Sequence, residues 1–138
     1  MQEGQVWETA MSAAHFQLDH LCAIIDYNKL QSDDLNANIM GIEPLADKWR
    51  SFGWYVQEID GHDFAAIGAA VVRSKQIERQ PQLVIAHTIK GKGVSFMEGV
   101  AAWHGSVKIK NEELRVALCE LGADEGQLEA YLNGNFWK

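Results

Sequence analysis

The chain has 138 residues, 47% of them hydrophobic, and a formal net charge of −7. This length fits one domain, which buries roughly two thirds of its unfolded surface. The hydrophobic content excludes a disordered chain. The negative charge argues against a nucleic acid partner, because a protein that binds a duplex needs a basic face.

The cysteines and the apolar runs of the sequence indicate where in the cell the protein is expected to be. Cys22 and Cys119 belong to no CxxC pair, so we expect reduced, buried thiols in a cytoplasmic protein. No basic segment precedes an apolar run at the start of the printed sequence, so we expect no signal peptide. The longest apolar run, residues 64–72, is too short to span a membrane.

Helical and strand patterns alternate along the chain, which indicates an α/β fold with one parallel sheet, because strand–helix–strand crossovers make parallel pairs. The first expected strand has the length of a strand buried on both faces. The expected strands span residues 21–26, 54–59 and 82–89. The expected helices span residues 5–18, 44–52, 64–77, 111–121 and 124–132.

Capping residues mark several of these boundaries. Asp63 and Asn111 suit the N-caps of the helices that follow them, and Pro44 suits a first turn. Gly53 and Gly122 suit helix ends. The remaining segments are expected to be an exposed polar loop, a long glycine-containing loop and a tail, at residues 31–43, 90–110 and 133–138.

The first strand ends in an abrupt change to Asp26-Tyr27-Asn28-Lys29. In an open α/β sheet, ligands bind in the loops past the carboxyl ends of the strands. Asn28 offers a neutral oxygen and the Leu30 carbonyl follows two residues on, and such oxygens suit Mg²⁺ beside phosphates. Asp and Asn after a strand are also common turn formers, so the residues alone leave a simple turn open.

Two further stretches can be interpreted either as ligand-binding or as purely structural. Lys90-Gly91-Lys92-Gly93 follows the third strand and offers point charges to a diphosphate, or forms a solvated basic turn. Glu3 precedes a helix whose N-terminus could receive a phosphate, or it simply suits the helix dipole. The five histidines form no HExxH motif and no cluster with cysteine, which argues against zinc.

Six stretches together resemble the thiamine-diphosphate-binding region of transketolases, and most closely the bacterial forms split into two subunits. Their order and spacing fit that family from residue 2 to about 121. The stretches are Glu3-Gly4-Gln5-Val6-Trp7-Glu8, Ile25-Asp26-Tyr27-Asn28-Lys29-Leu30, Glu43-Pro44-Leu45-Ala46-Asp47-Lys48-Trp49, Ile59-Asp60-Gly61-His62-Asp63, His87-Thr88-Ile89-Lys90-Gly91-Lys92-Gly93-Val94 and Trp103-His104-Gly105.

The resemblance implies an open parallel sheet flanked by helices, in a thiamine-diphosphate-binding fold. It implies that residues 1–138 are the C-terminal portion of that cofactor-binding domain. The implied reaction transfers a two-carbon ketol unit between sugar phosphates with thiamine diphosphate and Mg²⁺, as in the pentose phosphate pathway. A dihydroxyacetone synthase or a deoxyxylulose-phosphate synthase would keep the cofactor and change the reaction, although the Trp103-His104-Gly105 loop resembles transketolase more than the latter.

The resemblance also implies roles for single residues. Asn28 and the Leu30 carbonyl would hold Mg²⁺, and Lys90 would contact the diphosphate. His104 would contact the diphosphate and the hydroxyl groups of the ketose donor, which makes it the catalytic candidate. Glu3 would lie near the partner subunit. The implied cofactor-binding residues are Glu3, Gly4, Asn28, Lys90 and His104.

The implied partners are a pyrimidine-binding C-terminal subunit, which carries the glutamate that activates the cofactor, and further copies in a homo-oligomer. The family motif opens with Gly-Asp-Gly shortly before the position of Glu3, and its aspartate is a Mg²⁺ ligand. The printed sequence begins after that point. We therefore expect a truncated domain that binds the cofactor negligibly alone; the alternative is a non-catalytic assembly partner.

Overall fold

The computed structural model of the chain describes residues 1–105 and 107–134. The expected tail at 133–138 lies outside the described residues from residue 135 onward. Within the described part of the chain, no helix combines the length and the apolar character needed to cross a lipid bilayer.

The described residues form two compact units, each with its own packing. The first unit contains a sheet with its helices, and the second contains a long loop and a helical pair. The first unit comprises Met1–Lys29 and Leu35–Thr88, and the second comprises Leu30–Asp34 and the described residues from 89 onward.

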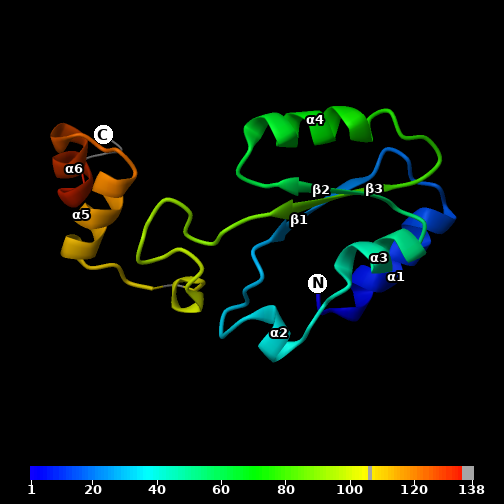
Figure 1. Cartoon of the computed structure of the whole chain (residues 1–138), viewed down its shortest axis with the longest axis horizontal. Helices are drawn as coiled ribbons and strands as arrows, with labels where there is room; N and C mark the ends of the chain where they lie inside the picture. The colour runs from blue at the N-terminus through cyan, green and yellow to red at the C-terminus, as the bar shows by residue number, and fades with distance from the viewer. Residues whose placement is uncertain (106, 135–138) are drawn as a thin grey trace. The chain divides into compact units, whose positions relative to one another are not determined.

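The first unit is built on a three-stranded parallel sheet with the strand order β1-β3-β2 (Figure 1). The pairing is in register, so that Tyr27 and Asp60 both lie opposite His87. The three carboxyl ends therefore meet at one edge, which confirms the predicted parallel α/β sheet. The strands are β1 (Cys22–Tyr27), β2 (Tyr55–Asp60) and β3 (Gln82–His87).

Helices cover both faces of this sheet, with α4 on one side and α1 and α3 on the other (Figure 1). The short helix α2 lies within the stretch that was expected to be an irregular loop, so that expectation was wrong there. The helices are α1 (Gly4–His15), α2 (Asn36–Ile39), α3 (Leu45–Ser51), α4 (Phe64–Ser74), η1 (Ala101–Trp103), α5 (Asn111–Glu120) and α6 (Glu125–Leu132).

Helix starts show one confirmed cap and two corrections. Asp63 Oδ1 accepts hydrogen bonds from the amides of Ala65 and Ala66 at 2.8 and 3.2 Å, which confirms the cap of α4. Asn111 is already helical, and Lys110 takes the N-cap position of α5. Pro44 likewise precedes α3 as its N-cap rather than lying in its first turn.

Helix ends follow backbone conformation. Gly53 and Gly122 have φ values of 90 and 83°, as the predicted stops require. Helix α1 ends at His15, three residues earlier than expected, because Gln17 takes a φ of 53°. The Leu18 amide then donates to the Ala13 carbonyl at 3.0 Å and closes the helix end.

The buried strand is β3 rather than β1. The first five residues of β3 are buried, because a neighbour pairs with it on each side. Strand β1 lies at the edge of the sheet, and its Ile24 is 62% exposed, so the prediction of a strand buried on both faces was wrong. Cys22 shares that outer face by alternation and is exposed, as is Cys119; both thiols are free but neither is buried as expected.

The core of the first unit lies between the sheet and helices α1 and α3. Trp54 donates from its indole Nε1 to the Ala10 carbonyl at 2.9 Å, in a buried position. Trp49 packs edge-to-face on Trp54, with the ring centroids 4.6 Å apart. The Trp49 Nε1 is also buried, but it meets no hydrogen-bond acceptor among the described residues.

The different bonding of the two indole groups predicts different losses of stability when each tryptophan is replaced by phenylalanine. Trp54→Phe removes a buried hydrogen bond, whereas Trp49→Phe removes a buried donor that is unsatisfied. We expect Trp54→Phe to lower the free energy of unfolding by about 1 kcal/mol more than Trp49→Phe, since both leave a similar cavity. Urea unfolding of the two variants measures the difference, and an equal or larger loss in Trp49→Phe would contradict it.

Candidate functional site

Polar side chains gather at the carboxyl edge of the sheet. The Thr88 hydroxyl, directly after β3, donates to the carboxylate of Asp26 in β1. His87 at the end of β3 lies 3.1 Å from the Glu58 carboxylate, measured from Nε2 to Oε2. The His87 ring also meets the ring of Tyr27 edge-on, with centroids 5.5 Å apart. Side chains thus link the strand ends.

Gly61 is required by the closeness of the chain at this edge. Its amide donates to the His87 carbonyl at 2.8 Å, just past the end of β2. A Cβ placed on Gly61 would clash with Thr88 Cγ2 and would lie 3.0 Å from Ala86 Cβ. Only glycine lets the turn after β2 lie this close to the end of β3.

Tyr27 and Glu43 share a hydrogen bond at this edge. The Tyr27 hydroxyl donates to Glu43 Oε1, and Glu43 Oε2 accepts the Leu45 amide at 2.8 Å. Burial, with the hydrogen bond and charge of Glu43, raises the pKa of Tyr27 to about 12. The hydrogen bond from Tyr27, with that from the Leu45 amide, lowers the pKa of Glu43.

Asn28 is the first residue past β1, and the backbone turns sharply after it. Lys29 has a φ of 65°, in the left-handed region that residues with side chains seldom adopt. Its carbonyl accepts the Asn36 amide at 2.9 Å, which holds the turn. Such strain is common at functional sites, and here it lies between the two predicted metal ligands, Asn28 and Leu30.

The start of α1 lies towards the same end of the sheet, because α1 runs opposite to β1 (Figure 1). Glu3 is the N-cap residue, and its carboxylate accepts a hydrogen bond from the Gln5 side chain rather than capping the helix amides. Gly4 is the first helical residue. Glu3, Gly4 and Asn28 therefore belong to the same end of the first unit.

Leu30, Lys90 and His104 belong to the second unit. The Lys90 carbonyl accepts the Gly99 amide at 2.8 Å, and His104 follows η1 as its C-cap. Gly91 has a φ of 74°, and a Cβ there would lie 2.7 Å from Met97 Cβ. The packing of the loop is therefore sufficient to explain why a glycine stands at position 91. Close approach of a diphosphate, which the sequence suggested, is not needed to explain it.

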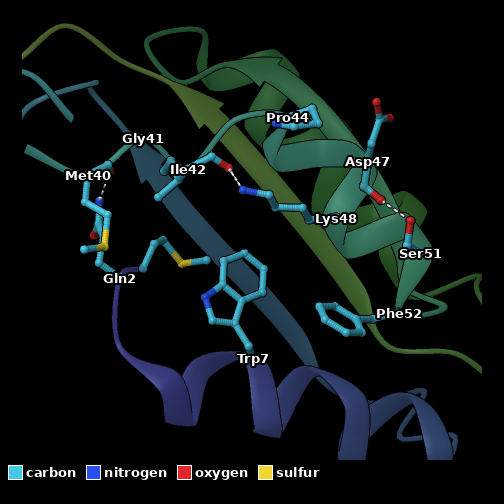
Figure 2. A pocket seen from close by; sticks show the side chains of 11 residues that line it. Gln2, Trp7, Met40, Gly41, Ile42, Pro44, Asp47, Lys48, Ser51 and Phe52 are labelled. Carbon is cyan, nitrogen blue, oxygen red and sulfur yellow. Dashed lines mark hydrogen bonds between the residues drawn. The ribbon is translucent and has the colours of Figure 1, made fainter. Parts of the chain in front are cut away.

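A pocket of ≈ 530 Å³ lies between α1 and α3 in the first unit (Figure 2). Trp7 and Phe52 form much of its apolar wall. Lys48 Nζ donates to the Ile42 carbonyl at 2.8 Å and lies 6.0 Å from the centroid of the Trp7 ring. None of the residues predicted from the sequence to form the site lines this pocket.

A second pocket, of ≈ 510 Å³, lies at the carboxyl edge. Its walls include Tyr27, Lys29, Glu43 and His87, so it adjoins the turn at Asn28. The carboxylate of Glu43 is already bonded by Tyr27, and His87 lies against Glu58, so these groups chiefly bond one another. Sequence reasoning missed these pairs, because their partners are far apart in the chain.

The donor chemistry fits Mg²⁺ better than a transition metal. Within residues 1–105 and 107–134 no three His, Cys, Asp or Glu side chains form a group that could hold a metal. The ligands predicted from the sequence, the Asn28 side chain and the Leu30 carbonyl, are both hard, neutral oxygens. Mg²⁺ accepts such a partial set, because it usually keeps waters and binds phosphate oxygens as well.

Comparison with known proteins identifies the family. Residues 1–130 match the family described as transketolase, thiamine diphosphate binding domain. The chain belongs to this family. The resemblance drawn from the six sequence stretches is thereby confirmed.

Curated relatives include subunits of transketolases. The chain is 49% identical over 119 residues to the 6-deoxy-6-sulfo-D-fructose transketolase subunit SqwG of Clostridium sp. (strain MSTE9), covering 86% of this chain and 43% of that protein. It is 39% identical over 132 residues to an apulose-4-phosphate transketolase subunit of Phocaeicola vulgatus, covering 96% and 47%. The chain thus spans less than half the length of these relatives.

Solved transketolases share the fold. The transketolase of Campylobacter jejuni superposes with a TM-score of 0.81 at 28% identity, over 89% of this chain and 19% of that one. A Pichia stipitis transketolase in complex with sedoheptulose 7-phosphate gives a TM-score of 0.80 at 27% identity, over 97% and 21%. The predicted α/β class is confirmed, whereas the individual site residues remain predictions.

The close packing at Gly61 predicts that a larger side chain at this position lowers the stability of the fold. Gly61→Ala should lower the free energy of unfolding by about 1 to 3 kcal/mol, because the new methyl group overpacks the end of β3. Gly68→Ala in α4 is the matched control, since a Cβ there meets nothing within 4 Å, and it should raise stability by up to about 1 kcal/mol. Thermal unfolding of both variants tests the pair, and a neutral Gly61→Ala would be inconsistent with this packing.

The pKa of Tyr27 predicts an alkaline loss of stability. The folded value of about 12 exceeds the ordinary 10.0, so the stabilisation is complete below pH 10 and is lost as the pH rises through 12. Tyr27→Phe lacks this ionisation, and the stability difference from the natural chain should shrink between pH 10 and 12. Urea unfolding across this range measures it; a constant difference would show that Tyr27 does not titrate there.

Proposed function

We propose that this chain supplies the diphosphate- and magnesium-binding half of the site in a thiamine-diphosphate-dependent transketolase. The reaction is the transfer of a two-carbon ketol unit from a ketose to an aldose phosphate. The cofactor supplies carbanion stabilisation, and the protein binds and orients it. Family membership supports the cofactor class, because the matched family is a thiamine diphosphate binding domain.

The position of Asn28 is the observation that carries the proposal. It is the first residue beyond β1, at the edge where parallel α/β sheets bind ligands. The left-handed Lys29 that follows it is a costly conformation for a lysine, and such strain is common where a site is held in place. Asn28 and the Leu30 carbonyl therefore hold Mg²⁺ in this proposal.

Other residues have supporting roles. The amides at the start of α1, near Glu3 and Gly4, suit the negative charge of a diphosphate. Lys90 adds a point charge for the same group. His104 donates or accepts hydrogen bonds at the diphosphate and at the hydroxyl groups of the donor sugar, as a positioned imidazole can.

The remainder of the active site is proposed to come from outside the residues printed here. The two curated relatives described above are named as subunits, and the chain spans less than half of each. A pyrimidine-binding subunit is the proposed partner, within an oligomer of both. Glu3, at the exposed N-cap of α1, is the proposed contact with that partner.

The donor is proposed to be a ketose that carries an anionic group at its far end. One relative is named for a sulfonated fructose and another for a ketose phosphate, so both groups occur among similar proteins. Assays with a phosphorylated and a sulfonated ketose, in the presence of the partner subunit, separate the two. Turnover of neither would overturn the proposed reaction.

Substituting one lysine tests the cofactor site. Lys90→Ala should weaken thiamine diphosphate binding about tenfold or more in the assembled enzyme, because a charge contact to the diphosphate is lost. Lys75→Ala is the matched control, since Lys75 is the C-cap of α4, beside the pocket at the amino ends of β1 and β3. Calorimetric titration with Mg²⁺ present measures both, and an equal effect of the two variants would exclude Lys90.

A further inference from the structure

We propose that the hydrogen bond from Tyr27 to Glu43 is a positioning device for Asn28, so that both residues act on the metal through the backbone at the end of β1. This inference rests on the proposed function, in which Asn28 is a ligand of Mg²⁺. Neither Tyr27 nor Glu43 touches the metal in this proposal. Each acts by fixing where the chain leaves the sheet.

The bond joins two residues that are 16 positions apart. Tyr27 is the last residue of β1 and is only 8% exposed, with its ring in the hydrophobic core. Glu43 lies just before α3, and its second oxygen accepts the Leu45 amide at 2.8 Å. The Glu43 carboxylate therefore joins the end of β1 to the start of α3, and the two ends of segment 28–42 are held close to each other.

The backbone on the N-terminal side of Asn28 is fixed as a result. The residue before Tyr27, Asp26, accepts the hydroxyl of Thr88 and is thereby fixed to β3. Tyr27 itself is fixed to Glu43, and its ring lies edge-on against His87. Two successive residues are thus fixed by their side chains, which limits the direction in which the backbone enters Asn28 and the left-handed turn at Lys29.

The charge of the pair also favours this role over a purely apolar contact. Hydrogen bonds to an ionised carboxylate are roughly twice as strong as neutral ones. A residue that positions a metal ligand commonly changes metal affinity about 10- to 100-fold when it is removed. A core residue without this role would change stability and leave metal affinity unaltered, so the two roles predict different results.

The variants isolate the hydroxyl and its acceptor. Tyr27→Phe removes the hydrogen bond and keeps the ring in the core and against His87. Tyr55→Phe is the matched control, because Tyr55 begins β2 at the amino end of the sheet. Glu43→Ala removes the acceptor of the hydrogen bond. Glu43→Gln keeps an acceptor oxygen, so it should retain part of the metal affinity that Glu43→Ala loses.

The probe is Mn²⁺ with thiamine diphosphate, added to the isotope-labelled chain assembled with the partner subunit, because the chain alone is expected to bind the cofactor negligibly. Binding is followed by broadening of the backbone amide signals of the labelled chain. We expect the broadening in the natural chain to be strongest at residues 28–30 and to fall off with distance from them, and we expect this pattern to be lost in Asn28→Ala. The Mn²⁺ concentration that gives half of the maximal broadening should be about tenfold higher in Tyr27→Phe and Glu43→Ala than in the natural chain. The increase should be smaller in Glu43→Gln, and Tyr55→Phe should need the same concentration as the natural chain.

Hydrogen exchange gives an independent readout of position. Amides of residues 28–29 and 35–42 should exchange faster in Tyr27→Phe than in Tyr55→Phe, while those of α4 should not. Broadening that is unaltered in Tyr27→Phe but lost in Asn28→Ala would overturn the positioning role and leave the metal site intact. Broadening that is absent from the natural chain, or unaffected by Asn28→Ala, would instead overturn the metal site of the proposed function.

Discussion

The burial of β3 between two parallel neighbours is the constraint on which the first unit depends. Its apolar residues lose water on both faces, and β1 and β2 satisfy its backbone on both edges. Because both neighbours run parallel and in register with it, all three strands end together. A single edge therefore receives the residues that follow each strand, and this edge carries the proposed metal ligand Asn28.

The polar contacts at that edge follow from the same register. Tyr27 and Asp60 lie opposite His87, so the residues just beyond them reach one another across the strand ends. Thr88 reaches back to Asp26, and the turn after β2 comes so close that only Gly61 fits. A tight edge of this kind fixes backbone direction without a large core, and precise placement is what a ligand site needs.

The sequence predicted the parts that depend on local pattern. Asp63 capped its helix and Gly53 ended one, because these residues act within a few positions of themselves. The burial of β1 was predicted wrongly, since strand order decides which strand is central, and composition does not contain it. The bond between Tyr27 and Glu43 was missed for a similar reason, because residues 16 positions apart meet only once the fold exists.

The charge balance of the proposed site shows why neutral ligands suit it. The chain carries a net charge of −7, so a diphosphate must find its positive partners locally. The two ligands proposed from this chain, the Asn28 side chain and the Leu30 carbonyl, are neutral, so they would leave the charge of Mg²⁺ for the diphosphate. Two carboxylates in their place would hold the ion more tightly and attract the diphosphate less. The affinities for metal and cofactor are thus coupled in the proposed site, and each raises the other by the same factor.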